Sequence, residues 1–394
     1  MIPYGRQSIE QQDIDAVISV LQSDWLTTGP ALKHFESDLA ERCAAKHAVA
    51  CNSGTAALHM AYAAAGIGPG SVVVVPVNTF LATANAAVYL GADVRFCDVD
   101  PDNGLMTPQT LSAVLDSSVS AVVPVHFAGQ ACDMQGIVDC LNKLSPNATL
   151  IEDASHAIGG SYQDGSPVGC SQYASMVTFS FHPVKHIAAG EGGAVMTDCE
   201  RLKQRLELFR CHGMTKDQAE LRRPDEGPWY YEMHRPGFNY RIPEASCALA
   251  GSQLKRLDSF VAQRRQIAAT YWEQLAGIDH LKLPSRDHLQ TSAWHLFCMH
   301  IDFEAFGRTR ADVMSELQQL GVGTQVHYYP VALQPFYQDR YDLLEGQFPG
   351  GCAHYNAALS IPMFSSLSER EIQKVIQAVQ QVMQPDFWTQ QRAA

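Results

Sequence analysis

Short apolar runs recur along the first half of the chain and alternate with longer helix-forming stretches. Most of these runs are continuous rather than alternating, which is typical of strands covered on both faces. The Ala- and Leu-rich segments 54–65 and 108–116 are long enough to be crossover helices. The pattern predicts an α/β fold with a large, mainly parallel, seven-stranded sheet. The expected strands are 47–51, 72–75, 94–97, 121–125, 149–152, 175–180 and 194–197.

The pattern changes after about residue 250, where long amphipathic stretches replace the short apolar runs. We therefore expect a large α/β domain with an N-terminal arm at 1–250 and a smaller α+β domain at 251–394. A run rich in Pro, Gly and aromatic residues, 221–238, predicts an irregular loop or arm. The elements expected in the smaller domain are one long helix at 251–276, a strand at 294–302, a helix from Thr309 to Leu320 and a last helix around 367–383, which Ser366-Leu-Ser-Glu-Arg would start.

Composition narrows the class of protein. The 394 residues are 46% hydrophobic and 18% charged, with Gly and Pro in ordinary numbers, which excludes collagen-like and disordered chains. A net charge of −13 argues against broad binding to nucleic acids or anionic membranes, so any phosphate site must be local.

The cysteines and the N-terminus bear on the compartment. Eleven cysteines occur without a C-x-x-C pair, and an odd number of them favours reduced thiols over a disulfide framework. The N-terminus lacks the basic and apolar regions of a signal peptide, and no uncharged apolar run reaches the ~20 residues of a membrane span. We expect a soluble cytoplasmic protein.

Asn52-Ser53-Gly54-Thr55 follows the first expected strand and begins an Ala-rich helix. Asn or Ser can cap that helix, and Gly54 would let an anion approach its free N–H groups. The alternative is a well-capped helix with no ligand. The chain has no G-x-x-x-x-G-K-[ST] motif, so an ATP-type phosphate loop is excluded.

Glu152-Asp153 ends a buried strand, at the edge where open α/β sheets bind ligands. A carboxylate there needs a partner, because an isolated buried charge is costly. Asp153 could form a plain salt bridge or hold a cationic ring nitrogen. His156, three residues further on, could bind a ligand or fill the loop.

Lys185 lies between an expected strand and the Gly-rich turn 190–193. A lysine in a desolvated pocket loses its proton more easily and can form a Schiff base, although most lysines are simply exposed. His182 and His186 flank it, but Pro183 argues against a helix that presents both to a metal ion. No third ligand is evident, so we expect no metal.

Four motifs taken in order resemble one known family. They are Asn52-Ser-Gly-Thr55, Glu152-Asp-Ala-Ser-His156, Ser180-Phe-His-Pro-Val-Lys185 and Gly237-Phe-Asn-Tyr-Arg241. Together they resemble the pyridoxal-phosphate-dependent nucleotide-sugar aminotransferases of the DegT/DnrJ/EryC1/StrS group, which have the aspartate-aminotransferase (type I) fold. The resemblance extends over essentially the whole chain.

The resemblance implies the cofactor pyridoxal 5'-phosphate and a role for each matching residue. Lys185 would hold the cofactor as a Schiff base and then move protons as general acid and base. Asp153 would pair with the pyridine nitrogen, and His156 would lie near the ring hydroxyl. The remaining implied cofactor contacts are Phe80 on the ring face, Gly54, Thr55 and Ser180 around the phosphate, and Asn239 toward the cofactor of a neighbouring subunit in a homodimer. The resemblance implies no metal ligands.

The substrate is also implied by resemblance. Ile2-Pro-Tyr4, the loop Leu26-Thr-Thr-Gly-Pro30 and Phe181-His-Pro-Val-Lys-His186 are most similar to the branch that aminates C4 of a UDP-linked 4-keto-6-deoxy-N-acetylhexosamine in pseudaminic acid biosynthesis. L-Glutamate would donate the amine and leave as 2-oxoglutarate. Segments that would line the sugar-nucleotide pocket contribute Tyr4, Thr27, Thr28, Ser53, His327 and Tyr328.

The sequence disfavours two alternatives and leaves a third open. A dehydratase branch of the family has His at the Schiff-base position, so Lys185 argues against it. A pyridoxal-phosphate-binding regulator without turnover finds no support, because the chain has no basic helix-turn-helix segment. An aminotransferase that acts on a different cyclic substrate, such as a dTDP- or GDP-linked keto sugar or a carbocycle, is compatible with the sequence.

Overall fold

The structure is a computed structural model, and it describes residues 1–384. Its largest sheet has seven strands in the order β1-β7-β6-β5-β4-β2-β3. β7 runs antiparallel to β1 and β6, whereas the other neighbouring pairs are parallel, so the predicted mainly parallel sheet is confirmed. The strands are β1 (His47–Cys51), β2 (Val72–Pro76), β3 (Asp93–Cys97), β4 (Val119–Val122), β5 (Thr149–Asp153), β6 (Met176–Ser180) and β7 (Gly193–Thr197).

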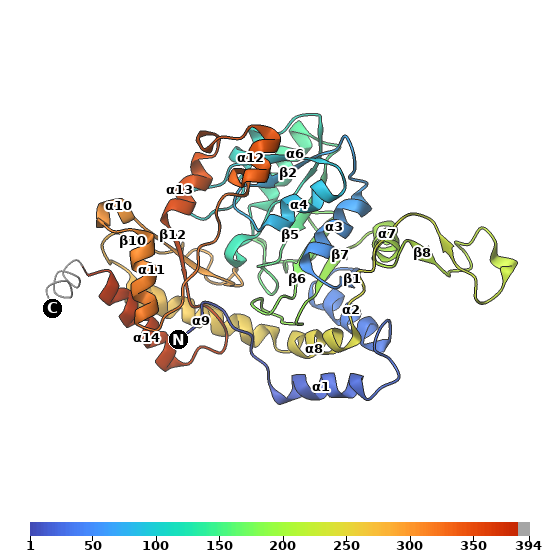
Figure 1. The fold of residues 1–394 in the computed structure, drawn as a ribbon, viewed down its shortest axis with the longest axis horizontal. Coiled ribbons are helices and arrows are strands. Elements are labelled where there is room, and N and C mark those ends of the chain that lie inside the picture. The colour runs from blue at the N-terminus through green and yellow to red at the C-terminus, as the bar shows by residue number, and fades with distance from the viewer. Residues whose placement is uncertain (385–394) are drawn as a thin grey trace.

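Helices cover both faces of this sheet, as the continuous apolar runs require (Figure 1). In β2, Val74 packs into the core on one face, while Val73 and Val75 pack into the core on the other. The helices that accompany the sheet are α1 (Gln11–Leu21), α2 (Pro30–Arg42), α3 (Gly54–Ala65), α4 (Leu81–Tyr89), α5 (Pro108–Ser112), α6 (Met134–Leu144), α7 (Glu200–Arg210) and α8 (Glu244–Leu254), with a 3₁₀ turn at Phe127–Gly129.

Two predicted bounds in this part were wrong. The strand expected at 121–125 ends at Val122, because Pro124 has no N–H to donate; its carbonyl accepts from the Asp153 N–H at 3.0 Å. The helix expected at 108–116 ends at Ser112. Beyond it, the Asp116 carboxylate accepts the N–H of Ser118 in a local turn that competes with a further helical turn.

A second, three-stranded antiparallel sheet lies in the C-terminal part and has its own apolar core. Its strands are β10 (Leu281–Lys282), β11 (Phe297–Ile301) and β12 (Ala358–Ile361). The helices of this part are α9 (Leu257–Leu275), α10 (Phe303–Phe306), α11 (Arg310–Gln319), α12 (Pro335–Tyr341), α13 (Pro349–Ala357) and α14 (Glu369–Val382), with 3₁₀ turns at Val331–Leu333 and Glu345–Gln347. The predicted boundary at residue 250 falls inside α8, and the division into two domains stays a prediction.

The single long helix predicted at 251–276 is wrong, because α8 and α9 are separate helices. Arg256 interrupts them, and its guanidinium pairs with Glu10 and Asp13 at the start of α1. α8 packs against α1 and α2, whereas α9 packs against α14 (Figure 1). The apolar stripe is continuous along the sequence, and it passes from one core to the other within α9: Leu257 and Val261 pack in the same core as Leu254 of α8, whereas Ile267 and Tyr271 pack in the C-terminal core.

The other C-terminal elements lie close to their predicted positions. α11 and α14 begin at capping boxes built on Thr309 and Ser368. The strand predicted at 294–302 begins only at Phe297, because Trp294 has a φ of 52° and cannot belong to a strand.

The arm predicted at 221–238 projects from the body of the molecule (Figure 1). Its strand β9 (Glu232–Met233) pairs with β8 (Met214–Thr215), which precedes the predicted arm, and a 3₁₀ turn lies at Pro224–Glu226. All eleven cysteines are free thiols. Within residues 1–384, no helix combines the length and apolar character needed to cross a bilayer.

Candidate active site

A cavity of about 550 Å³ opens where β5 and β6 end and where α3 and α4 begin. The carboxyl ends of adjacent parallel strands are the usual ligand-binding edge of such a sheet. The cavity collects most of the predicted site residues: Tyr4, Ser53, Gly54, Thr55, Phe80, Asp153, His156, Ser180, Lys185, His327 and Tyr328.

Asp153, the last residue of β5, is buried, and both of its carboxylate oxygens are held. Oδ2 accepts the hydroxyl of Thr83 at 2.8 Å, and Oδ1 accepts the N–H of Ser155 at 3.1 Å. The Thr83 hydroxyl in turn lies 2.7 Å from that of Thr79. These contacts fix a negative charge at the end of the strand, where it can hold a cationic group.

Lys185 lies on a tight turn after β6, in which its N–H donates to the carbonyl of His182 at 2.8 Å. Desolvation lowers the pKa of the Lys185 amine to about 8, and the nearby Asp153 carboxylate opposes that shift. An amine that is partly neutral near physiological pH can act as a nucleophile or a base.

The N-terminus of α3 faces the end of β6 at very close range. Ser53 is the N-cap and accepts the N–H of Ala56 at 3.1 Å. A Cβ on Gly54 would lie 2.7 Å from Cβ of Ser180, so only glycine fits between the helix and the strand. Gly54 and Thr55 occupy the first helical positions, whose N–H groups lack partners within a helix and favour an anion.

Aromatic side chains form another wall of the cavity. Phe80, the N-cap of α4, is 58% exposed although it is a large apolar residue, and its ring centroid lies 6.3 Å from that of Tyr328. His156 is buried, with Nε2 3.4 Å from the Tyr328 hydroxyl. An exposed phenylalanine ring that faces a cavity can stack on a planar ligand.

The predicted sugar-nucleotide residues separate into two groups. Tyr4 and His327 line the cavity with ring centroids 5.6 Å apart, and Nδ1 of His327 lies 2.9 Å from the Ser360 hydroxyl. Burial, reinforced by the Lys185 charge, lowers the pKa of His327 to about 3. Thr27, Thr28 and Asn239 are not among the described residues that line the cavity.

The metal reading of His182 and His186 finds no geometric support. His186 is buried, and its Nε2 lies 2.7 Å from the carbonyl of Ala293. A different group, Cys298, His300 and His354, brings three donor atoms within 4.8 Å of one another, away from the cavity. His300 Nε2 and His354 Nδ1 hydrogen-bond each other at 3.1 Å, so one potential ligand nitrogen of each ring is already paired.

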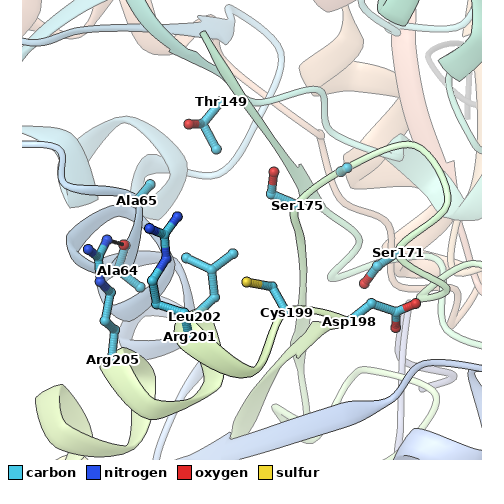
Figure 2. A pocket seen from close by; sticks show the side chains of 11 residues that line it. Ala64, Ala65, Thr149, Ser171, Ser175, Asp198, Cys199, Arg201, Leu202 and Arg205 are labelled. Atoms are coloured by element: carbon cyan, nitrogen blue, oxygen red, sulfur yellow. Dashed lines mark hydrogen bonds between the residues drawn. The ribbon is translucent and has the colours of Figure 1, made fainter. Parts of the chain in front are cut away.

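A second pocket lies at the opposite edge of the sheet, beside the first residue of β5 and the residue that follows β7 (Figure 2). Its two arginines come from α7, and Arg205 donates to the carbonyl of Ala64 at 2.9 Å, near the end of α3. None of the predicted site residues lines it.

Comparison with known proteins identifies the fold and the chemistry. The model of the DegT/DnrJ/EryC1/StrS aminotransferase family matches residues 7–380. The chain belongs to this family. Spore coat polysaccharide biosynthesis protein SpsC of Bacillus subtilis (strain 168) is 36% identical over 383 residues, which cover 97% of each chain.

Solved structures agree with this assignment. Helicobacter pylori PseC, an aminotransferase involved in the biosynthesis of pseudaminic acid, superposes with a TM-score of 0.88 at 27% identity, over 97% of this chain and 99% of that one. The PLP-form of the putative sugar aminotransferase Spr1654 from Streptococcus pneumoniae gives a TM-score of 0.87 at 25% identity, over 97% and 98%.

The predictions of a pyridoxal-phosphate-dependent sugar aminotransferase, its fold class and its cofactor are therefore confirmed. The cavity suits the cofactor chemically. It offers an amine of lowered pKa, a fixed carboxylate and a helix N-terminus at which only glycine fits.

Proposed function

We propose that this protein transfers an amino group from L-glutamate to the C4 keto carbon of a UDP-linked 4-keto-6-deoxy-N-acetylhexosamine. The observation that carries the proposal is Lys185, whose pKa is lowered to about 8, in one cavity with the fixed Asp153 carboxylate. The likeness to PseC over 97% of the chain supports the choice of sugar class.

Five residues would hold the cofactor around Lys185. The N–H groups of Gly54 and Thr55, with Ser180, would bind its phosphate, because that helix end favours an anion. Asp153 would pair with the pyridine nitrogen and keep it protonated, and Phe80 would stack on the ring. When bound, the cofactor supplies an electron sink for carbanion chemistry.

Lys185 would act as the general acid and base. Its amine lies in the cavity that would hold the substrate, so it could take the proton from the substrate carbon that bears the nitrogen and then act as the acid that returns this proton. With a pKa near 8, the amine exchanges protons readily at neutral pH, whereas an ordinary lysine with a pKa of ~10.4 would hold its proton. His156 would donate to the ring oxygen of the cofactor.

The same site would take its two substrates in turn. Tyr4, Ser53, His327 and Tyr328 line the cavity and would contact the sugar nucleotide. We assign Thr27, Thr28 and Asn239 to the part of the site that a second subunit completes, since none of them lines the cavity of its own chain.

Separate half-reactions test the proposal. Purified protein loaded with pyridoxal phosphate should lose its visible absorption band on addition of L-glutamate and release 2-oxoglutarate. The UDP-linked keto sugar should restore the band, and the dTDP-linked analogue should restore it at least tenfold more slowly. Equal rates would refute the nucleotide assignment, and no response to glutamate would refute the donor.

A further inference from the structure

Three buried histidines form a row that leads away from the cavity. His156 lies after β5, His295 before β11, and His186 directly after Lys185. The ring centroids of His156 and His295 are 4.3 Å apart, and those of His295 and His186 are 5.6 Å apart. Only His156 of the three lines the cavity, so the other two can act on a ligand only through it.

The hydrogen bonds of His156 specify where its proton lies. The N–H of Ala128 donates to Nδ1 at 3.3 Å, so Nδ1 must be the unprotonated nitrogen. A neutral imidazole then carries its proton on Nε2, which lies 3.4 Å from the Tyr328 hydroxyl on the cavity side. In this tautomer, His156 can only donate a hydrogen bond into the cavity.

His295 is held against His156 by an unusual anchor. The buried guanidinium of Arg264 donates through Nη1 to the carbonyls of Trp294 at 3.0 Å, His295 at 3.2 Å and Met363 at 2.8 Å. It uses these carbonyls in place of a carboxylate partner. Trp294 itself has a φ of 52°, and this conformation turns the chain immediately before His295.

The segment that carries Ala128 is fixed to the segment that carries His295. Ala293 N–H donates to the Gly129 carbonyl at 3.0 Å, and Leu296 N–H donates to the Ala128 carbonyl at 3.3 Å. A Cβ on Gly129 would lie 2.7 Å from the Trp294 nitrogen, so only glycine allows this approach. The N–H that selects the tautomer and the ring that covers His156 therefore form one rigid unit.

The groups around His156 also oppose a second proton on its ring. Desolvation lowers the pKa of His156 well below its ordinary value, and the charges of Lys185, His327 and His186 lower it further. Desolvation also lowers the pKa of His295, and the neighbouring His156 lowers it further. The Tyr328 hydroxyl is the other titratable group at the ring.

We propose that His295 is a positioning residue that covers the inner face of His156 and holds it as a neutral imidazole with its proton on Nε2, a fixed hydrogen-bond donor to the cofactor's ring oxygen. The inference rests on the proposed function, in which the cofactor occupies this cavity. His295 would act by covering the His156 ring, so another flat ring of similar size at position 295 should have the same effect.

The test is histidine-selective ¹⁵N NMR on the full-length protein, with and without pyridoxal phosphate. The ¹⁵N shifts of the two ring nitrogens report the tautomer directly, and the signals that vanish in His156→Asn identify His156. Wild type and His295→Phe should show one Nε2–H tautomer from pH 6 to 9. In His295→Ala, where water reaches the ring, the signals should show mixed tautomers or protonation below pH 7. Exposed His34 provides the control, and His34→Ala should leave the pattern unchanged.

Kinetics add an independent readout. We expect kcat of His295→Ala to fall by about tenfold, less than the full loss of a catalytic acid–base group, with KM for L-glutamate within about twofold. An Nδ1–H tautomer in the wild type, or an unchanged pattern in folded His295→Ala, overturns the inference. Because the tautomer is also read without the cofactor, failure of the proposed function would appear separately, as a loaded protein whose visible band does not respond to L-glutamate.

Discussion

Asp153 depends for its orientation on a hydroxyl that contributes no charge to the site. Thr83 donates to Oδ2 at 2.8 Å, and a hydrogen bond to a charged group contributes about 1.5–3 kcal/mol. Thr83→Val keeps the shape of the side chain but removes the donor. We expect kcat/KM to fall by about tenfold, since the carboxylate would lose its alignment with the ring nitrogen.

The matched control is Thr83→Ser, which retains the hydroxyl and should stay within about threefold of wild type. Steady-state kinetics with L-glutamate and the keto sugar would compare both variants. A loss in Thr83→Ser with none in Thr83→Val would mean that the γ-methyl packing of Thr83 matters rather than its hydrogen bond.

The lowered pKa of Lys185 gives a pH dependence with a definite sign. Covalent capture of pyridoxal phosphate requires the neutral amine, whose fraction rises about tenfold per pH unit below a pKa of about 8 and levels off above it. Stopped-flow capture by cofactor-free protein should therefore accelerate from pH 6 to 8 and then reach a plateau. An ordinary lysine would keep accelerating to about pH 10. Lys185→Ala gives the background rate, and continued acceleration above pH 9 would contradict the assigned shift.

The site could be predicted from the sequence only where its residues end strands or begin helices. Asp153 and Ser180 end adjacent strands, and Gly54 begins the helix that meets them, so one edge of a parallel sheet brings them together. Thr83 and His295 were missed. The Thr83 side chain reaches the site from the interior of α4, whereas His295 packs against His156 from a turn held by tertiary contacts, and no local pattern marks either one.

At the scale of elements, a residue from one helix caps another. Glu244, in the first turn of α8, is buried and accepts the N–H groups of Gly29, Ala31 and Leu32 at the start of α2. α2 has no side-chain cap of its own. Glu244 therefore takes the place of a local N-cap.

Glu244→Ala should lower the free energy of unfolding by about 3 kcal/mol, because it leaves several N–H groups without a partner in a partly buried setting. Equilibrium urea denaturation of the cofactor-free protein would measure the change. Glu369→Ala, in the first turn of the exposed face of α14, should cost less than about 0.5 kcal/mol. Similar decreases in the free energy of unfolding in both variants would show that the Glu244 hydrogen bonds do not stabilise the fold more than an exposed glutamate does.

Helices and strands could be predicted from the sequence where the local pattern of apolar residues determines where they begin and end. The seven strands of the large sheet were found because each is an apolar run between turns. The break between α8 and α9 was not predictable, since the apolar stripe continues across Arg256, whose ion pairs with Glu10 and Asp13 depend on the tertiary structure. The start of β11 was missed because tertiary contacts impose the positive φ of Trp294.

At the scale of the whole molecule, one face of α1 lies outside the core of its own chain (Figure 1). Ile14, Ile18 and Leu21 follow one stripe of the helix and are exposed, although Asp13 on the other side is buried. Large apolar patches on a soluble protein usually mark an interface. This stripe would contribute to the proposed homodimer, in which Asn239 would reach the neighbouring site.

Ile14→Glu combined with Ile18→Glu should weaken the dimer by at least tenfold in Kd, because charges would be buried in an apolar contact. Sedimentation equilibrium would measure it. Leu344, an exposed leucine in the C-terminal part, provides the control, and Leu344→Glu should leave association unchanged. A wild-type protein that is monomeric at micromolar concentration would contradict the shared site.

In the proposed mechanism, Lys185 carries the cofactor in this cavity. The most direct measurement is borohydride reduction of the loaded protein, followed by peptide mass mapping, with Lys185→Ala as the control. We expect one pyridoxyl group per chain, attached to Lys185 and absent after prior addition of L-glutamate. Attachment to any other lysine, or unchanged labelling after glutamate, would contradict it.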